Sequence, residues 1–115
     1  MGSQGPQIHR TTMFKIPDEK NQEKIVDAYR RLAEEQEKDG KPYILYSYAG
    51  NACDDQRSKG YTVVAYTRFA SLDDMKYYDD ECPAHAALKK KGATLGVSEP
   101  PLIVYFEGAP IINSS

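Results

Sequence analysis

The segment from Gly60 to His85 constrains the fold more than any other stretch of this 115-residue chain. Its first ten residues, ending at Phe69, are rich in β-branched and aromatic side chains, which is typical of a β-strand. Ser71 then predicts a helix start, because its hydroxyl can accept a hydrogen bond from a free backbone amide. Pro83 predicts a second start, because proline is well tolerated in the first helical turn. We therefore expect a strand followed by a broken helix that carries His85 beyond the break.

Three more strands and one long helix are expected in the rest of the chain. The expected strands cover residues 8–16, 42–49, 60–69 and 102–107. The long helix is expected to begin after Pro17 and Asp18 and to run to about Lys38, because apolar residues recur there every three or four positions. Gly40 is expected to end this helix, since glycine readily adopts the left-handed conformation of a C-cap.

The order of these elements is β-α-β-β-α-β, the split βαβ arrangement of ferredoxin-like folds. We predict an α+β fold in which a four-stranded antiparallel sheet carries both helical segments on one face. One domain is expected, spanning residues 8–107, because 115 residues suffice for a single modest core. Residues 1–7 are expected to be disordered, and residues 108–115 form a tail.

Both faces of the expected sheet are rich in apolar side chains. In the strand at 60–69, Val63 and Phe69 alternate with Val64 and Tyr66, so each face receives large side chains. Ile44, Tyr46 and Tyr48 are expected to share one face of the strand at 42–49. The tyrosines expected to form an aromatic layer are Tyr46, Tyr48, Tyr66 and Tyr105. We predict that two sheets pack face to face in a homodimer; a monomer with partly exposed tyrosines is the alternative.

Composition excludes several classes of function. Fifteen basic and seventeen acidic residues give a net charge of −2, which argues against nucleic acid as a partner. The absence of a long apolar run argues against a membrane span, and no signal peptide is recognisable, so the protein is expected to be cytoplasmic. The two cysteines, Cys53 and Cys82, have no zinc-site spacing, and Cys82 is expected to be a small apolar core residue. The acidic run Asp79–Glu81 is expected to be a solvated loop, and no metal site is expected.

The chain resembles the stress-responsive α/β-barrel family, the dimeric α+β barrels abbreviated Dabb. The residues that carry this resemblance are Gly60-Tyr61-Thr62, Thr67 with Phe69, Ser71, Tyr78 and Pro83-Ala84-His85. It extends from about Ile8 to Glu107. The family often has His-Pro-x-His at the helix break, whereas Cys82 stands at the first of those positions here. The resemblance implies a dimeric barrel built from two ferredoxin-like chains.

The same resemblance implies a set of site residues. In a plant polyketide cyclase of this family, a histidine at the helix break works with a tyrosine on the preceding helix, and these match His85 and Tyr78. Tyr29, on the long helix, matches a further tyrosine less closely. Val63 and Arg10 stand where that cyclase carries histidines, and His9 is expected on the other sheet face in a structural or solvent-facing role. The substrate-binding residues expected beside the catalytic pair are Tyr29, Val63, Phe14 and Arg10.

Two functions remain open from the sequence. The first is a stress-associated dimer that binds a small apolar or aromatic molecule without catalysis. The second is a lyase or polyketide cyclase that needs no metal or organic cofactor and uses His85 as general base with Tyr78. A haem monooxygenase is a third alternative, for which only His9 and His85 could serve as axial ligands. A cavity reached by His85 and Tyr78 separates these functions, because a filled core there excludes the enzyme.

Overall fold

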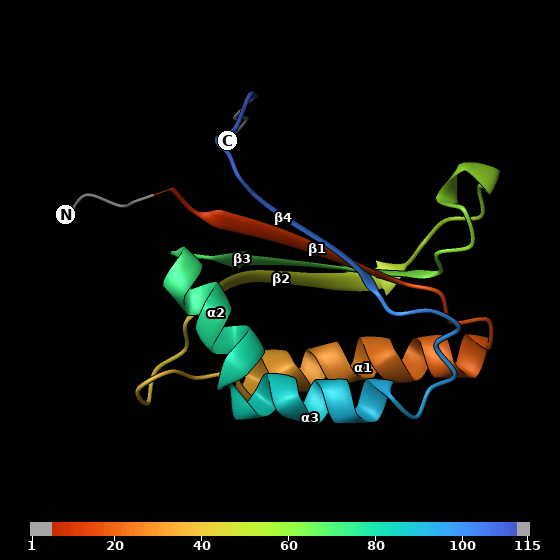
Figure 1. Ribbon diagram of the computed structural model, residues 1–115, viewed down its shortest axis with the longest axis horizontal. Coiled ribbons are helices and arrows are strands. Elements are labelled where there is room, and N and C mark those ends of the chain that lie inside the picture. Colours follow the sequence, from red (N-terminus) through yellow and green to blue (C-terminus); the bar gives the residue numbers. More distant parts are fainter. Residues whose placement is uncertain (1–5, 113–115) are drawn as a thin grey trace.

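The computed structural model describes residues 6–112, which form a four-stranded antiparallel sheet with three α-helices on one face (Figure 1). The elements are β1 (Ile8–Phe14), α1 (Glu19–Glu35), β2 (Ile44–Asn51), the 3₁₀ helix η1 (Gln56–Ser58), β3 (Val63–Phe69), α2 (Leu72–Asp80), α3 (Pro83–Gly92) and β4 (Leu102–Glu107). The strands lie in the order β2-β3-β1-β4. The predicted ferredoxin-like α+β fold is confirmed. Of the segments predicted at the two ends, residues 1–5 and 113–115 lie outside the described residues.

Helix α1 begins where the sequence predicted and ends three residues early. The Asp18 carboxylate accepts a hydrogen bond from the Lys20 amide at 2.8 Å and caps the first turn. The helix ends at Glu35 because the side chain of Gln36 accepts hydrogen bonds from the amides of Tyr43 and Ile44, at 2.9 and 3.0 Å. These bonds bind the helix end to the start of β2.

The expectation that Gly40 caps α1 is therefore wrong. Asp39 and Gly40 have φ values of 54° and 78° and form a tight turn between Lys38 and Lys41. Two consecutive residues with positive φ are the requirement of a type I′ turn, which Asp-Gly satisfies well. The glycine serves the left-handed backbone, as expected, but in a turn beyond the helix.

The broken helix follows the sequence prediction closely. The Ser71 hydroxyl accepts a hydrogen bond from the Asp74 amide at 3.1 Å and caps α2. After α2 ends at Asp80, Cys82 becomes the N-cap residue of α3, and Pro83 occupies the first turn of α3. The break brings the first turn of α3 back beside the last turn of α2, and this positions His85.

Strands β1 and β3 alternate strictly between a buried inner face, which the helices cover, and an outer face that they leave open. The inner residues are Ile8, Arg10, Thr12 and Phe14 of β1 and Val63, Ala65, Thr67 and Phe69 of β3. The outer face, defined here by cross-strand pairing, includes His9, Tyr46, Tyr48, Tyr66, Arg68, Leu102, Val104 and Phe106. The predicted faces of β3 are confirmed, and both faces of the sheet are apolar.

Two predictions about the outer face are wrong. The register of β2 shifts between Ile44 and Tyr46, so Ile44 lies opposite inner Phe69 whereas Tyr46 lies opposite outer Arg68. A β-bulge of this kind adds one residue and reverses the alternation, which no simple period reveals. Tyr105 lies opposite Arg10 and thus belongs to the inner face, while its neighbour Phe106 takes the expected place in the aromatic layer.

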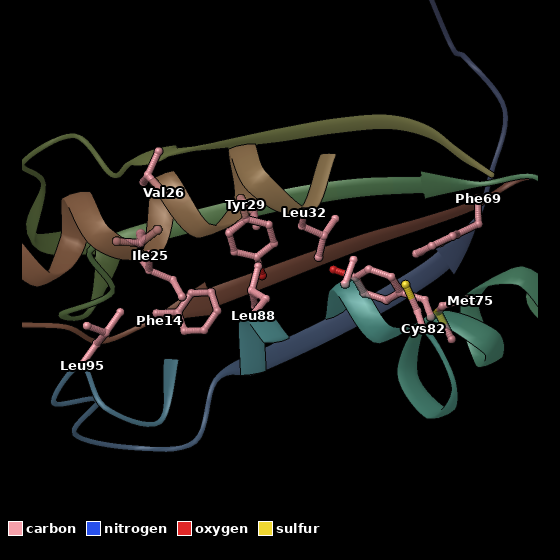
Figure 2. Packing of buried hydrophobic residues seen from close by; sticks show 14 of the residues in the cluster. Phe14, Ile25, Val26, Tyr29, Leu32, Phe69, Met75, Cys82, Leu88 and Leu95 are labelled. Atoms are coloured by element: carbon pink, nitrogen blue, oxygen red, sulfur yellow. The ribbon is translucent and has the colours of Figure 1, made fainter. Parts of the chain in front are cut away.

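The core fills the space between the inner face and the helices. Figure 2 shows Phe14, Ile25 and Leu95 at one end of this core and Phe69, Met75 and Cys82 at the other, with Tyr29 and Leu32 between them. Cys82 is 2% exposed and packs among apolar side chains, which confirms its predicted role as a core residue.

Candidate functional site

A cavity of about 610 Å³ lies between the sheet, α1 and α3, on the side of the sheet where β4 forms the edge. Strand β1 supplies Arg10 and Phe14 to its wall, and α1 supplies Tyr29. Helix α3 supplies His85 and Leu88, and the connection from α3 to β4 closes one side. Four of the six predicted site residues therefore line one cavity: His85, Tyr29, Phe14 and Arg10.

His85 is buried in the cavity wall and held in one orientation. Its Nδ1 lies 2.8 Å from the backbone carbonyl oxygen of Tyr78, and its ring stacks on the Tyr78 ring with centroids 3.6 Å apart. A carbonyl oxygen only accepts hydrogen bonds, so Nδ1 must carry the proton, and Nε2 of the neutral ring keeps a free lone pair. Burial, the main cause, lowers the pKa of His85 to about 4. The ring is therefore neutral at pH 7.

Tyr78 lies behind His85 and does not line the cavity. Its side chain is 2% exposed and packs between the His85 ring and Phe69, whose ring centroid is 5.1 Å away. Burial raises the pKa of Tyr78 far above its ordinary value, so the phenol stays protonated. Tyr78 thus fixes the plane of the His85 ring, and its carbonyl fixes the tautomer.

Arg10 and Asp79 form an ion pair beside this stack. Arg10 Nη1 donates to both Asp79 carboxylate oxygens, at 2.8 and 2.7 Å, and the guanidinium lies 5.3 Å from the centre of the Tyr78 ring. The nearer Asp79 oxygen lies 3.9 Å from His85 Nδ1. The expectation of a solvated acidic loop is wrong for Asp79, which belongs to the last turn of α2. An arginine on the inner face needs an anionic partner, and that was the sequence signal for an acid here.

Phe14, Tyr29 and Val63 differ in their relation to the cavity. Phe14 and Tyr29 both line it, with their rings edge to face at 6.2 Å. Burial is the main cause that raises the pKa of Tyr29 to about 12, so its phenol is also protonated. Val63 is wholly buried opposite Phe14 in the sheet, and it is part of the core instead of the cavity wall.

His9 lies on the outer face, as the sequence analysis expected. Its Nδ1 is 2.6 Å from the Tyr66 hydroxyl, and its ring stacks on Phe106 with centroids 5.0 Å apart. His9 and His85 are therefore on opposite sides of the sheet, and no single cavity in one chain contains both. Between residues 6 and 112, no three His, Cys, Asp or Glu side chains come close enough to hold a metal ion.

No helix in this part of the chain has both the length and the apolar character needed to cross a membrane. The structure is a ferredoxin-like α+β domain with a cavity of small-molecule size between the sheet and the helices. Residues 8–96 match the family described as the stress responsive A/B barrel domain, Dabb. This match covers most of the chain, so the protein belongs to that family, as its resemblance predicted.

One relative is known from a biosynthetic gene cluster. The Fusaristatin A biosynthesis cluster protein of Gibberella zeae is 48% identical to this chain over 83 residues. The aligned residues are 72% of this chain but 60% of the relative, so the alignment spans about three fifths of that protein.

Solved structures share the fold at low sequence identity. The hydroxynitrile lyase from Passiflora edulis has a TM-score of 0.73 at 12% identity, covering 94% of this chain and 98% of its own. A ferredoxin-like protein of unknown function from Bacteroides fragilis, described as dimeric, has a TM-score of 0.67 at 19% identity, with 92% and 100% covered. At these identities the likeness shows the fold alone.

Proposed function

We propose that this protein binds a small apolar or aromatic molecule in the cavity beside His85. The observation that carries the proposal is the cavity of about 610 Å³, which stays open next to a filled core. Its wall combines apolar residues such as Phe14 and Leu88 with the polar groups of Tyr29 and His85, the usual composition of a small-molecule site. The relative in a biosynthesis cluster agrees with a role in small-molecule metabolism.

Filling the cavity tests this proposal. Leu88→Trp places an indole where Leu88 now lines the cavity, and Ala86→Trp makes the same change at an exposed position of α3 outside it. Native mass spectrometry of freshly purified protein, with titration of an aromatic probe such as 2-naphthol, measures occupancy. We expect Leu88→Trp to lose binding and Ala86→Trp to keep it. Equal binding by both variants contradicts a site in this cavity.

A second candidate function is proton abstraction by His85, in a lyase or polyketide cyclase that uses no cofactor. The observation that favours it is the bond from His85 Nδ1 to the Tyr78 carbonyl, which leaves Nε2 as a hydrogen-bond acceptor on a neutral ring. Tyr78 is then a positioning residue. We expect His85→Ala to lower turnover by roughly a hundredfold, whereas Tyr78→Phe, which keeps the stacked ring and the backbone carbonyl, should leave turnover nearly unchanged. His9→Ala, on the outer face, is the control, and full turnover by His85→Ala excludes this candidate.

We also propose that two copies pack outer face to outer face as a twofold homodimer. The outer face of one chain leaves Tyr48, Val104 and Phe106 about half exposed or more, at 61, 50 and 51%. A contiguous apolar surface of this kind is rare on a monomer and typical of an interface. The ferredoxin-like protein from Bacteroides fragilis is described as dimeric, which agrees with self-association of this fold.

A further inference from the structure

Arg10 has hydrogen-bond donors that no residue between 6 and 112 uses. Its Nη1 serves Asp79, but Nε and Nη2 have no partner in this range, although the side chain is only 6% exposed. A buried guanidinium with unused N–H groups is costly unless another acceptor is present. In the same part of the chain, the Tyr43 hydroxyl is the one side-chain polar atom that is both fully enclosed and unpartnered. The free donors of Arg10 therefore reach open space, and the open space beside Arg10 is the cavity.

This end of the cavity carries an excess of positive charge. Lys89, also in the wall, lies at its edge and donates from Nζ to the Asp79 backbone carbonyl at 2.8 Å. This end of the cavity wall thus holds two cationic side chains, Arg10 and Lys89, and one carboxylate, that of Asp79, which pairs with Arg10. The other acid in the wall, Glu99, is paired with Lys15 at 3.1 Å.

The same excess of positive charge affects the pKa of His85. Burial is the main cause of its lowered pKa, and the hydrogen bond to the Tyr78 carbonyl opposes it. The charges of Lys89 and Arg10 lower the pKa further, and the charge of Asp79 raises it. An anion bound beside Arg10 would reverse this electrostatic effect, since a nearby negative charge stabilises the imidazolium.

We propose that the cavity selects an aromatic or apolar molecule that carries a carboxylate, and that this carboxylate binds Arg10 Nη2 and Lys89 Nζ. The inference rests on the proposed ligand-binding function and names the class of ligand. The planar guanidinium matches a carboxylate in geometry, and hydrogen bonds between charged partners are about twice as strong as neutral ones. Ligand binding is then coupled to the proton affinity of His85, because the bound carboxylate lies in the same cavity as the His85 ring.

A matched pair of probes tests the inference on the full-length protein. 2-Naphthoate and 2-naphthamide have nearly the same shape and differ in charge. By isothermal titration we expect naphthoate to bind at least about tenfold more tightly than naphthamide. Lys89→Gln should reduce this preference by several fold without weakening naphthamide. Lys90→Gln, the same change at the exposed neighbouring position outside the cavity wall, should leave the preference intact.

Arg10→Met should abolish the preference, and Lys89→Gln keeps the test decisive if that variant does not fold. NMR titration of His85 supplies a readout that a purely structural role does not move: naphthoate should raise the His85 pKa and naphthamide should not. Equal affinities for the two probes overturn the carboxylate inference and leave ligand binding standing. Failure of both probes to bind overturns the inference together with the proposed binding of aromatic molecules.

Discussion

On each side of the sheet, a tyrosine contacts both a histidine and an arginine. The inner cluster consists of His85, Tyr78 and Arg10, and the outer cluster consists of His9, Tyr66 and Arg68. In the inner cluster the rings stack, and the arginine pairs with a carboxylate. In the outer cluster Arg68 Nε donates to the Tyr66 hydroxyl at 2.9 Å, and this hydroxyl lies 2.6 Å from His9 Nδ1.

The difference between the clusters lies in Asp79 and in burial. Because Arg10 is removed from water, it needs the Asp79 carboxylate, and the pair stands at the wall of a cavity. Arg68 is half-buried and donates a hydrogen bond to the phenol oxygen of Tyr66. Its guanidinium carbon also lies 4.8 Å from the centre of the Tyr46 ring and 5.8 Å from the centre of the Tyr66 ring. The same three residue types thus form a charged pocket wall on one face and an aromatic surface suited to self-association on the other.

The largest expected effect concerns the outer cluster. Tyr66→Asp replaces an aromatic ring in the proposed interface by a carboxylate, which must be desolvated on association even though Arg68 stands beside it. A twofold dimer buries this change twice, so we expect about 4 kcal/mol of lost association. Tyr105→Asp makes the same change at an exposed position of β4 that belongs to the inner face, and it should leave the dimer intact. Sedimentation equilibrium measures the dissociation constant of the dimer for both variants. A wild-type protein that sediments as a monomer at micromolar concentration contradicts the proposed dimer.

The next largest effect tests whether Arg10, unlike Arg68, requires a carboxylate partner for stability. Asp79→Asn removes the carboxylate from a guanidinium that stays buried, and we expect it to lower the free energy of unfolding by about 3 kcal/mol. The double change Asp79→Asn with Arg10→Met removes both charges and should cost less. Urea unfolding of the two variants checks this order. A double variant less stable than Asp79→Asn would show that the charge of Arg10 is not what the carboxylate compensates.

The pH dependence of stability should come largely from the inner histidine. His85 has an ordinary pKa of 6.5 when unfolded and about 4 when folded, so the unfolded chain binds more protons between these values. Stability contributed by the neutral ring is complete above pH 6.5 and is lost as the pH falls to 4, by up to about 3 kcal/mol. His85→Gln, measured by urea unfolding from pH 7 to 4, should show a shallower loss than wild type. Parallel curves contradict burial of a neutral imidazole.

The smallest effect compares the two tyrosine hydroxyls. Tyr66→Phe removes the group that joins His9 to Arg68 and should cost about 1 kcal/mol. The Tyr78 hydroxyl has no hydrogen-bond partner among the described residues, so Tyr78→Phe should change stability by a few tenths of a kcal/mol at most. Thermal unfolding of both variants makes the comparison. A larger loss in Tyr78→Phe would place a hydrogen bond in the inner cluster instead.

Local chemistry made much of the fold predictable. The Ser71 cap, the break at Pro83 and the strand Leu102–Glu107 were each confirmed, because caps, proline and apolar runs act within a few residues. The early end of α1 and the bulge in β2 were missed. Both depend on contacts between segments: the Gln36 side chain with the start of β2, and β2 with β3.

The candidate site was partly predictable, because Arg10, Phe14, Tyr29 and His85 all line the cavity. Asp79 was missed as a partner of Arg10, since 69 residues separate them and only the folded chain brings them to 2.7 Å. Tyr78 lies behind His85, and Val63 lies in the core. The functional roles of His85, Tyr78 and Arg10 remain predictions that the variants above test, and those of Phe14 and Tyr29 remain predictions.

The sequence by itself determined the order of helices and strands, the apolar character of both sheet faces and the position of His85 just after a helix break. These follow from periodicity, capping and backbone restriction, which are properties of neighbouring residues. Only the tertiary structure decided which polar groups meet at the cavity and which arginine is buried with a carboxylate. Those outcomes depend on strand register and on how α2 and α3 pack against the sheet, and so on free energies summed over residues far apart in the chain.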